Sequence, residues 1–331
     1  MSNYKSIKGT SIKEYSVDPI TLPEGQMWFN SYTGKFKIYS DAPILAAWSM
    51  ANNTPIYAFQ NGGFGTQTAA VLAGGKDILA FVDSRFDSYN YDGNVYTASG
   101  NLITDRGYLS GAGAGTQTAG LISGGYSSGT LGGIFSTEEY NGSSWTSGGT
   151  MIAAAYEHSM RGTQTAAVLT NGENGTELYD GTSWTSGSSH IHSSFPNYDA
   201  AMGGTQTAMI QAGGGSVFFD FKTDSYLFDG TTWTSGPTRM LSRNTSGGFG
   251  TQTNFNLNGG FYDMGFAYLS ELYDGMVWST SVYQLNEHSR APTAGSPSAG
   301  VSMGGNYGDG TGMYSWTEEL DTTGGSVLTE L

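Results

Sequence analysis

Residues 65–75 read GTQTAAVLAGG, and the chain repeats this stretch. A close copy, GTQTAGLISGG, occupies residues 115–125, and the Gly-Thr-Gln-Thr core occurs five times, 42 to 50 residues apart. Its glycines are Gly65, Gly115, Gly162, Gly204 and Gly250. Because a catalytic site needs only one copy, five copies indicate a repeated structural unit. A period of this length is typical of β-propeller blades.

A second signal follows each copy: Tyr or Phe, then Asp-Gly or Asn-Gly, and in four of the five copies a Trp. These segments begin at Tyr91, Tyr140, Tyr179, Phe228 and Tyr273. Asn-Gly and Asp-Gly favour the two-residue turns of β-hairpins. A degenerate sixth unit reads GSPSAGVSMGG from residue 295 and YSWTEEL from residue 314. No capped helical period is apparent, so we predict an all-β fold of six units.

Packing gives a reason for the small residues of the repeat. Strands near a propeller axis are covered on both faces by neighbouring blades, so they read as continuous apolar runs such as AAVLAGG. The Trp of each unit is expected further out, where the blades diverge. The Gly-Thr-Gln-Thr segment would join the inner strand to the second strand. Its glycine allows a positive φ, and its polar side chains can hydrogen-bond backbone groups. We therefore predict a structural role for the repeat.

The pattern of Gly-Gly, Tyr-Asp/Asn-Gly and Trp resembles kelch β-propellers. More narrowly, GTQTA followed by TEEYNGSSWTSGG resembles the propeller proteins of marine tailed bacteriophages, including cyanobacterial ones. The segment GQMWFNSYTGKFKIY at residues 25–39 is similar to one that often precedes the block in those proteins. The resemblance implies a six-bladed kelch-like β-propeller, a short N-terminal β-hairpin or attachment segment, and a place in the virion. Two units depart from it: the first has Tyr96 in place of Trp, and the sixth lacks both repeat motifs.

We expect two regions, an attachment segment at 1–40 and the propeller at 41–331. Trp48 precedes Gly65 by 17 residues, and Trp145 precedes Gly162 by the same distance. Trp48 therefore sits at an outer-strand position with no preceding unit, and the sixth unit lacks a clear outer Trp. The Trp48 segment would complete the last blade and so close the ring. The competing outer strand is SVLTEL at residues 326–331.

The charge and the lack of cysteine restrict the classes of molecule that this chain is expected to bind. The formal net charge is −15, which disfavours binding to nucleic acid or anionic lipid. Five of the seven lysines lie before residue 38. Without cysteine there is no thiolate chemistry and no Cys-ligated zinc. No segment resembles a signal peptide or a membrane span, so we expect synthesis in the host cytoplasm, no membrane insertion and no nucleic-acid partner.

Four short stretches of the sequence could carry chemistry. His190 and His192 form a His-x-His pair that could hold a metal or belong to a polar loop. GYSSG at 125–129 matches a nucleophile motif, but it lacks the required strand-to-helix setting. DSRFD at 83–87 and DFKTD at 220–224 could bind calcium or be solvated loops. We predict no enzyme activity, no metal and no cofactor. A carboxylate pair for sugar cleavage stays open, because a propeller can bring distant residues together.

The repeat topology predicts two different faces. The Gly-Thr-Gln-Thr and Asp-Gly turns are short and uniform, whereas the loops on the opposite face are long and differ in every unit. Binding is usually carried by such loops on a rigid scaffold. The expected ligand-binding residues are aromatic and polar residues of these loops, namely Arg85, Phe86, His190, His192, Phe195, Tyr198, Phe219, Phe221, Tyr262 and Phe266.

The N-terminal segment combines apolar and basic residues in a hairpin too small to be stable alone. We expect it to dock onto other virion proteins through Trp28, Phe29, Lys35, Phe36 and Lys37. The predicted function is a structural protein of a phage tail fibre or tail appendage that presents its loop face to a host-surface glycan or protein. A purely architectural decoration or baseplate subunit and a glycan-cleaving depolymerase are the alternatives.

Overall fold

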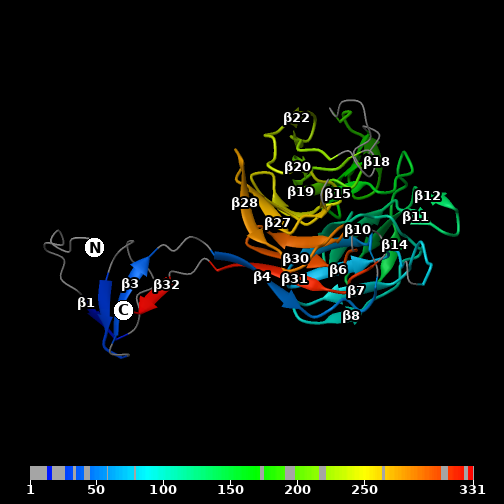
Figure 1. Cartoon of the computed structure of the whole chain (residues 1–331). Helices are drawn as coiled ribbons and strands as arrows, with labels where there is room; N and C mark the ends of the chain where they lie inside the picture. The colour runs from blue at the N-terminus through cyan, green and yellow to red at the C-terminus, as the bar shows by residue number, and fades with distance from the viewer. Residues whose placement is uncertain are drawn as a thin grey trace. The chain divides into compact units, whose positions relative to one another are not determined.

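The computed structural model describes residues 13–16, 27–32, 35–40, 45–57, 59–77, 80–171, 175–190, 198–215, 221–262, 265–306, 312–323 and 327–330. Among these residues all regular structure is β, without a helix. The chain divides into two compact units. One consists of Met1–Ala46 with Thr322–Leu331, and the other of Ala47–Asp321. The larger unit contains six four-stranded sheets arranged around a common axis (Figure 1).

The first three sheets, or blades, follow the repeat in order from the axis outward. Blade 1 consists of β5 (Gly62–Thr66), β6 (Ala69–Ala73), β7 (Ser88–Tyr91) and β8 (Tyr96–Ala98). Blade 2 consists of β9 (Ala114–Thr116), β10 (Ala119–Ser123), β13 (Thr137–Tyr140) and β14 (Trp145–Ser147). Blade 3 consists of β15 (Ser159–Thr163), β16 (Ala166–Thr170), β17 (Thr176–Tyr179) and β18 (Trp184–Ser186).

The other three blades have the same antiparallel arrangement. Blade 4 consists of β19 (Ala201–Thr205), β20 (Ala208–Ala212), β21 (Ser225–Phe228) and β22 (Trp233–Ser235). Blade 5 consists of β23 (Gly247–Thr251), β24 (Asn254–Asn258), β27 (Leu269–Tyr273) and β28 (Trp278–Tyr283). Blade 6 consists of β29 (Thr293–Ser296), β30 (Ala299–Met303), β31 (Thr317–Thr323) and β4 (Leu45–Ala51).

The ring of blades is closed. The six inner strands contact one another in chain order, and β29 contacts β5. The outer strand of blade 6 is β4, which carries Trp48, so an early segment completes the last blade. Closure leaves no free inner or second strand as an edge. The predicted all-β, six-bladed propeller is confirmed.

The hydrogen bonds of the repeated glutamine explain why Gly-Thr-Gln-Thr recurs along the chain. In the turn between β9 and β10, Gln117 Nε2 donates to the carbonyls of Ala70 and Tyr91 in blade 1, at 3.0 and 2.9 Å. Each of these bonds crosses from one blade to the preceding one. The equivalent bonds of the other copies are made by Gln67, Gln164, Gln206 and Gln252. The sixth unit has Pro297 at this position, so blade 6 has no such bond to blade 5.

A second inter-blade bond lies further out. Trp145 Nε1 donates to Ser88 Oγ of the preceding blade at 3.0 Å. Tyr96, which stands where the other units have Trp, pairs its hydroxyl with Thr317 Oγ1 of blade 6 at 2.8 Å. All six interfaces have this bond, the remaining pairs being Trp184–Thr137, Trp233–Thr176, Trp278–Ser225 and Trp48–Ser270.

Apolar residues fill the space between blades. Between blades 1 and 2, Phe64 of the inner strand contacts Trp145 edge-on, with ring centroids 6.2 Å apart. The cluster around them includes Val71, Leu109 and Ile122, all fully buried. Gly120 leaves room for Phe64, because a Cβ there would lie 2.0 Å from its ring.

The smaller unit is a separate four-stranded sheet of order β1 (Lys13–Tyr15), β2 (Met27–Asn30), β3 (Lys35–Ser40) and β32 (Val327–Glu330). β2 and β3 form the expected antiparallel hairpin, with Phe29 opposite Phe36. β32 pairs with β3, so the segment at 326–331 does not supply the outer strand of blade 6. The compact propeller unit therefore ends at Asp321 rather than at residue 331.

Candidate functional site

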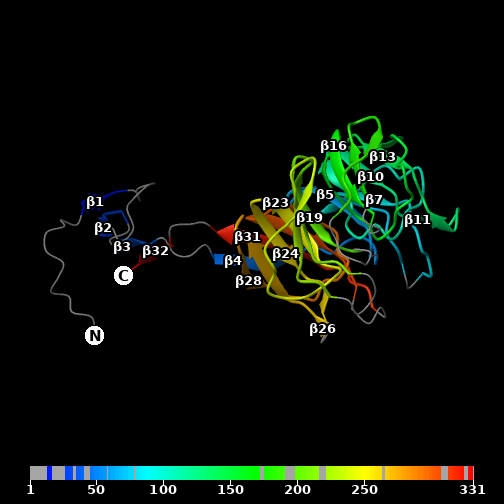
Figure 2. The ribbon, with the colours of Figure 1, turned by 90° about the horizontal axis from the view of Figure 1, so that it is seen from above.

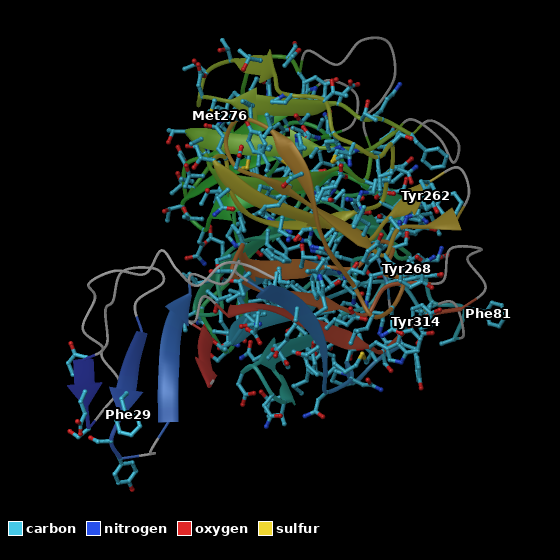
Figure 3. All side chains as sticks on the ribbon, turned by 60° about the vertical axis from the view of Figure 1, so that its left-hand side comes forward. Phe29, Phe81, Tyr262, Tyr268, Met276 and Tyr314 are labelled. Carbon is cyan, nitrogen blue, oxygen red and sulfur yellow. The ribbon has the colours of Figure 1, made fainter. Side chains whose placement is uncertain are left out.

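The two ends of the propeller are built differently. One end, here called the turn face, carries the turns between first and second and between third and fourth strands, including Met276. The other, the loop face, carries the loops between second and third strands and between blades. Figure 3 shows Met276 at one end and Phe81, Tyr262 and Tyr314 at the other. Two small hairpins, β11 (Tyr126–Ser127) with β12 (Gly132–Gly133) and β25 (Phe261–Tyr262) with β26 (Gly265–Phe266), belong to loop-face loops, and Figure 2 shows β11 projecting from the ring.

Buried glutamates hold the loop face together. Near the start of β13, Glu138 accepts bonds from the backbone amides of Ile103 and Thr104, at 2.7 and 2.9 Å, in the loop that arrives from blade 1. The same position in three other third strands is taken by Glu177, Glu271 and Glu318, which also accept bonds from the incoming loop. These loops are therefore anchored close to the strands.

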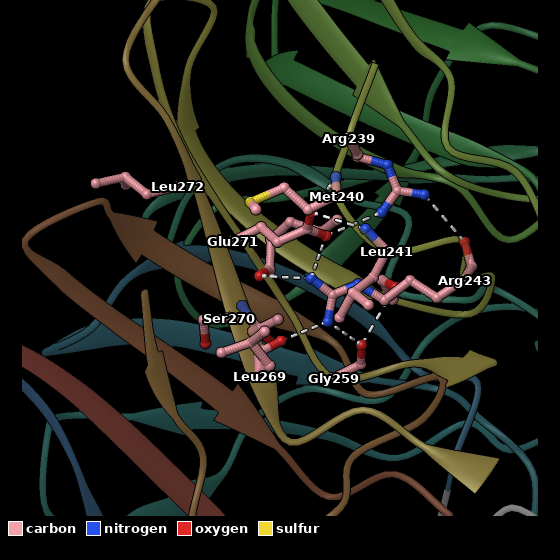
Figure 4. A network of polar contacts seen from close by, with 12 residues as sticks. Arg239, Met240, Leu241, Arg243, Gly259, Leu269, Ser270, Glu271 and Leu272 are labelled. Atoms are coloured by element: carbon pink, nitrogen blue, oxygen red, sulfur yellow. Dashed lines mark hydrogen bonds and ion pairs between the residues drawn. The ribbon is translucent and has the colours of Figure 1, made fainter. Parts of the chain in front are cut away.

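In blade 5 this anchor includes two arginines (Figure 4). Glu271 Oε2 lies 2.7 Å from Arg243 Nη2 and 3.4 Å from Arg239 Nη1, and all three side chains are fully buried. Glu271 Oε1 also accepts the backbone amide of Met240 at 2.8 Å, while Arg243 donates to the carbonyl of Gly259 at 3.0 Å. Removing one partner from a buried ion pair leaves the other charge uncompensated, so this network fixes the loop it holds.

At the axis, each blade has a non-glycine residue with a positive φ just before the inner strand, and blade 2 has two, Tyr108 and Ser110. The φ of Ser110 is 50°, and the φ angles of the others lie between 52° and 57°. Such a conformation is uncommon for residues other than glycine and tends to occur at functional sites. We use the name axial cluster for one of these residues from each blade, namely Gln60, Tyr108, Glu157, Asp199, Thr245 and Arg290.

Backbone hydrogen bonds link the axial cluster from blade to blade. The Glu157 amide donates to the Tyr108 carbonyl at 2.7 Å, and the Asp199 amide donates to the Glu157 carbonyl at 3.0 Å. The Arg290 amide donates to Thr245, and the Gln60 amide donates to Arg290, at 2.9 and 3.3 Å. The positive φ of these residues is thus held by their neighbours around the ring.

Side chains of the axial cluster meet across the axis. Arg290 of blade 6 places Nε 3.1 Å from Asp199 Oδ2 of blade 4 and Nη2 3.9 Å from Glu157 Oε1 of blade 3. Gln60 Nε2 of blade 1 donates to Glu157 Oε1 at 3.1 Å. Because these blades are not neighbours, their side chains can meet only near the axis. Burial, followed by the Asp199 carboxylate, raises the pKa of Glu157 above its ordinary value.

Arg161 closes the axis below the cluster. Its guanidinium donates to carbonyls of other blades, among them Gly111 at 2.6 Å, Gly113 at 3.2 Å and Thr293 at 3.3 Å. Burial lowers the pKa of Arg161 to about 10. Arg161 lines two axial cavities, one of about 10 Å³ that also includes Ser110, and one of about 130 Å³ on the side of the repeated turns. Arg161 therefore closes the axis on the side of the cluster that faces the repeated turns.

Aromatic side chains adjoin the cluster. The ring of Tyr108 lies 5.5 Å from that of Tyr126 and 6.4 Å from that of Tyr156, centroid to centroid. Lys76 Nζ lies 4.4 Å from the Tyr108 centroid and 2.7 Å from Asp83 Oδ1. The side chain of Tyr156 is 48% exposed, so an aromatic surface is available to solvent next to Glu157.

The structure places the predicted ligand residues of blade 1 in the loop between β6 and β7. Arg85 is occupied within the protein, because it makes 2.8 Å ion pairs with both Asp77 and Asp87. The neighbouring Phe86 is 46% exposed. Only Phe86 of this pair thus offers much free surface.

The predicted ligand-binding residues of blades 4 and 5 do not form one site with Arg85 and Phe86 of blade 1. His190 is buried, with its ring 4.5 Å from those of Tyr226 and Trp233, so the structure places it in the interior rather than on a ligand-facing surface. Phe221 packs on Phe261 at 5.5 Å, beside Tyr262 in β25. Tyr198 bonds to the backbone of Gly215, and Phe266 lies in β26. His192, Phe195 and Phe219 lie outside the described residues.

The predicted docking residues lie on the β2–β3 hairpin. The register pairs Trp28 with Lys37, Phe29 with Phe36, and Asn30 with Lys35. The predicted docking residues therefore lie on two paired strands of the smaller sheet.

The axial cluster was not predicted from the sequence. In five units its member lies five residues before the glycine of the repeat position, as Glu157 does before Gly162. Its residue type changes from unit to unit, so only this spacing could have revealed it. The anchoring glutamates had a clearer signal, since Ser/Thr-Glu recurs in four third strands, as at Thr137 and Glu138.

In the part of the chain that the structure describes, no three His, Asp or Glu side chains gather closely enough to hold a metal ion. The same residues include no helix with the length and apolar character needed to cross a membrane.

Comparisons with known proteins support the fold. No protein-family model matches the sequence, and no curated protein matches it. Among solved structures the chain is similar to one described as the structure of YjhT, with a TM-score of 0.67. The match covers 81% of this chain and 95% of that one at 11% sequence identity. At this identity the likeness concerns architecture alone, and it agrees with a six-bladed β-propeller.

Proposed function

We propose that this chain is a kelch-like propeller protein of a phage virion, part of a tail fibre or tail-associated appendage, whose loop face binds the host surface. The observation that carries the proposal is the difference between the two ends of the propeller. The turn face repeats one pattern, as in the bonds of Gln117 and Gln164. The loop face carries dissimilar loops anchored by Glu138 and its equivalents. Rigid presentation of variable loops is the usual arrangement of a recognition surface.

The resemblance to propellers of marine tailed phages supports the virion part of the proposal. It rests on the repeat and on GQMWFNSYTGKFKIY at residues 25–39. In this proposal the smaller sheet joins the chain to other virion proteins, and the acidic propeller does not contact nucleic acid. Its hairpin carries Lys35 and Lys37, which suit an acidic partner surface.

The location in the particle tests this proposal against its main rival. An antibody raised against residues 45–323 should label distal tail structures in electron micrographs of the virion. Labelling over the capsid would show that the protein is a decoration subunit and would overturn the role in host binding.

Deletion of residues 1–40 tests the docking segment. Because β4 begins at Leu45, the deletion keeps all six blades, and we expect a folded propeller that no longer joins the particle. The measurement is the amount of protein in purified virions, with circular dichroism of the free variant as the control for folding. Normal incorporation would contradict the docking role.

A glycan-cleaving enzyme is the second alternative, and the axial carboxylates make it worth testing. Each of them is already bonded within the protein, Glu157 to Gln60 and Asp199 to Arg290. A glycosidase needs one carboxyl group free to protonate the leaving oxygen and a second free to attack or activate water. We therefore expect the purified protein to release no oligosaccharide from host-surface polysaccharide, and a clear release would contradict the proposal.

A further inference from the structure

Two loops of the loop face carry large apolar side chains that are almost fully exposed. Phe81 lies in the loop between β6 and β7 and is 94% exposed, and Leu131 lies between β11 and β12 and is 79% exposed. They are equivalent, because each stands six positions after the second glycine of a Gly-Gly pair, Gly75 or Gly125. Figure 3 shows Phe81 at the loop-face end of the propeller. We call Phe81 and Leu131 the tip residues.

The backbone conformation of both tip residues is one that side chains disfavour. Their φ angles are 56° and 53°, in the left-handed region where glycine or asparagine is usual. An apolar side chain that stays in water gains nothing from the hydrophobic effect. Glycine would therefore serve the fold at least as well at either position. Residues kept in this conformation cluster at functional sites, so we look for their role outside the folding of this chain.

Hydrogen bonds join the loops of the two tip residues to each other. Asp105, in the segment that connects blade 1 to blade 2, accepts bonds from Ser127 Oγ and Ser128 Oγ, both at 2.7 Å, in the loop of blade 2. It also accepts a bond from Ser84 Oγ in the loop of blade 1, and this oxygen lies 3.0 Å from Ser128 Oγ. The two loops are thus fixed relative to each other, and preorganised contact groups bind with less loss of conformational entropy.

The surface around the tip residues is also apolar. Further large apolar residues of these loops and of the segments between blades are half-exposed, namely Phe86, Ile103, Phe135, Ile152 and Tyr156. Aliphatic and phenyl groups offer a sugar neither a hydrogen-bond donor nor an acceptor, whereas a protein pocket buries them with the release of water. Exposed apolar patches of this kind mark protein interaction sites. The surface therefore fits an apolar region of another protein better than a polysaccharide.

The charges of the blade 1 loop indicate what surrounds that apolar region. Lys76 pairs with Asp83 at 2.7 Å. Arg85 pairs with both Asp77 and Asp87 at 2.8 Å, which leaves one carboxylate in excess. The side chains of Asp83 and Asp87 are 51% and 38% exposed, against 20% for each cation, so solvent meets mainly the carboxylates. Lysine or arginine of a protein would be attracted here, whereas the phosphates of a lipid surface would be repelled.

We propose that the tip residues Phe81 and Leu131 bind a host-surface protein by entering apolar pockets that are rimmed by lysine or arginine. The half-exposed apolar residues around them complete the contact. This inference rests on the proposed function and deepens it, because it names protein, rather than glycan or lipid, as the class of molecule that the loop face binds.

Binding of the fluorescently labelled full chain to host cells tests the tip residues. Phe81→Gly and Leu131→Gly should each weaken binding about tenfold, read as the midpoint of a titration, because each removes a side chain that the partner buries. Because glycine accepts the positive φ, neither variant should unfold at a lower temperature than the wild type. Met276→Ala, at an exposed apolar residue of the turn face, is the matched control and should bind normally.

Treatment of the cells separates the classes of partner. Protease digestion of surface proteins should abolish binding of the wild-type chain, whereas periodate oxidation of surface glycans should leave it unchanged. Vesicles of extracted host lipid should not bind the chain.

Unchanged binding by both glycine variants would overturn the inference and leave the proposed function intact. Loss of binding after periodate but not after protease, or capture of the chain by the lipid vesicles, would do the same. A glycine variant that unfolds at a markedly lower temperature would also contradict the inference, since its side chain would then serve the fold. Failure of the wild-type chain to bind cells at all would instead overturn the proposed function itself, and the inference with it.

Discussion

One glutamine side chain connects neighbouring blades at five of the six interfaces, all within the described residues. Gln117 shows the arrangement: its amide nitrogen donates to Ala70 on the second strand and Tyr91 on the third strand of the preceding blade. The threonines that flank the glutamine, such as Thr116, are exposed. The repeat therefore owes its constancy mainly to the glutamine and the glycine.

Replacing Gln117 by Ala should lower the free energy of unfolding by about 1–2 kcal/mol, because two inter-blade hydrogen bonds are lost. Urea denaturation followed by tryptophan fluorescence measures the change. Thr116→Ala, one residue away and exposed, is the control and should be nearly neutral. Equal stability of the two variants would show that the glutamine does not join the blades.

The pH dependence of stability should reveal the buried His158. Burial lowers its pKa to about 4 in the folded protein, against about 6.5 in an unfolded chain. Between these values the unfolded state binds more protons, so stability falls as the pH is lowered from 7 to 5. The contribution of this residue is about 1–2 kcal/mol over that interval.

Denaturation at pH 7 and pH 5 measures this effect. His158→Gln should lose less stability than the wild type over the interval, whatever its stability at pH 7. An identical loss in both proteins would assign the pH dependence to other groups.

At the scale of the element, the outer strand shows how the ring closes. Trp48 on β4 donates to Ser270 of blade 5, as Trp145 on β14 donates to Ser88 of blade 1. Both indoles are buried, at 5% and 6% exposure. A strand from the start of the chain thus has the same environment as an internal outer strand.

Trp48→Ala and Trp145→Ala should therefore each lower the free energy of unfolding by about 3–5 kcal/mol, the usual cost of truncating a buried large aromatic residue. Trp316→Ala should cost less, because Trp316 lies outside the outer strands and is partly exposed. Thermal unfolding of the three variants makes the comparison. A neutral Trp48→Ala would mean that β4 does not hold the sixth blade.

Elements with a repeated pattern could be predicted from the sequence, and contacts without one could not. The 17-residue spacing located Trp48, because every outer strand stands at the same distance from the next inner strand. The interior position of His190 could not be predicted, since its ring packs on Tyr226, which stands where four other third strands have a glutamate. The partner of β32 was missed because its pairing with β3 joins segments far apart in the chain.

At the scale of the whole molecule, closure of the ring creates the candidate site. Gln60, Glu157 and Arg290 come from blades 1, 3 and 6, and they meet only because six inner strands surround one axis. Sequence reasoning predicted the loop face as the functional end, but it selected aromatic loop residues such as Phe86 and Phe221. The axial residues could not be predicted from the sequence, because their proximity depends on the number of blades.

The central claim is that the loop face, and not the turn face, contacts the host. The chain has no cysteine, so a single one can carry a polyethylene glycol chain at a chosen position. Phe81→Cys places it on the loop face, and Met276→Cys places it on the turn face, at residues that are 94% and 78% exposed. The measurement is the binding of each modified protein to host cells. We predict that the polymer at residue 81 abolishes binding to host cells and that the polymer at residue 276 leaves it unchanged. Unchanged binding with the polymer at residue 81, or loss only with the polymer at residue 276, would contradict it.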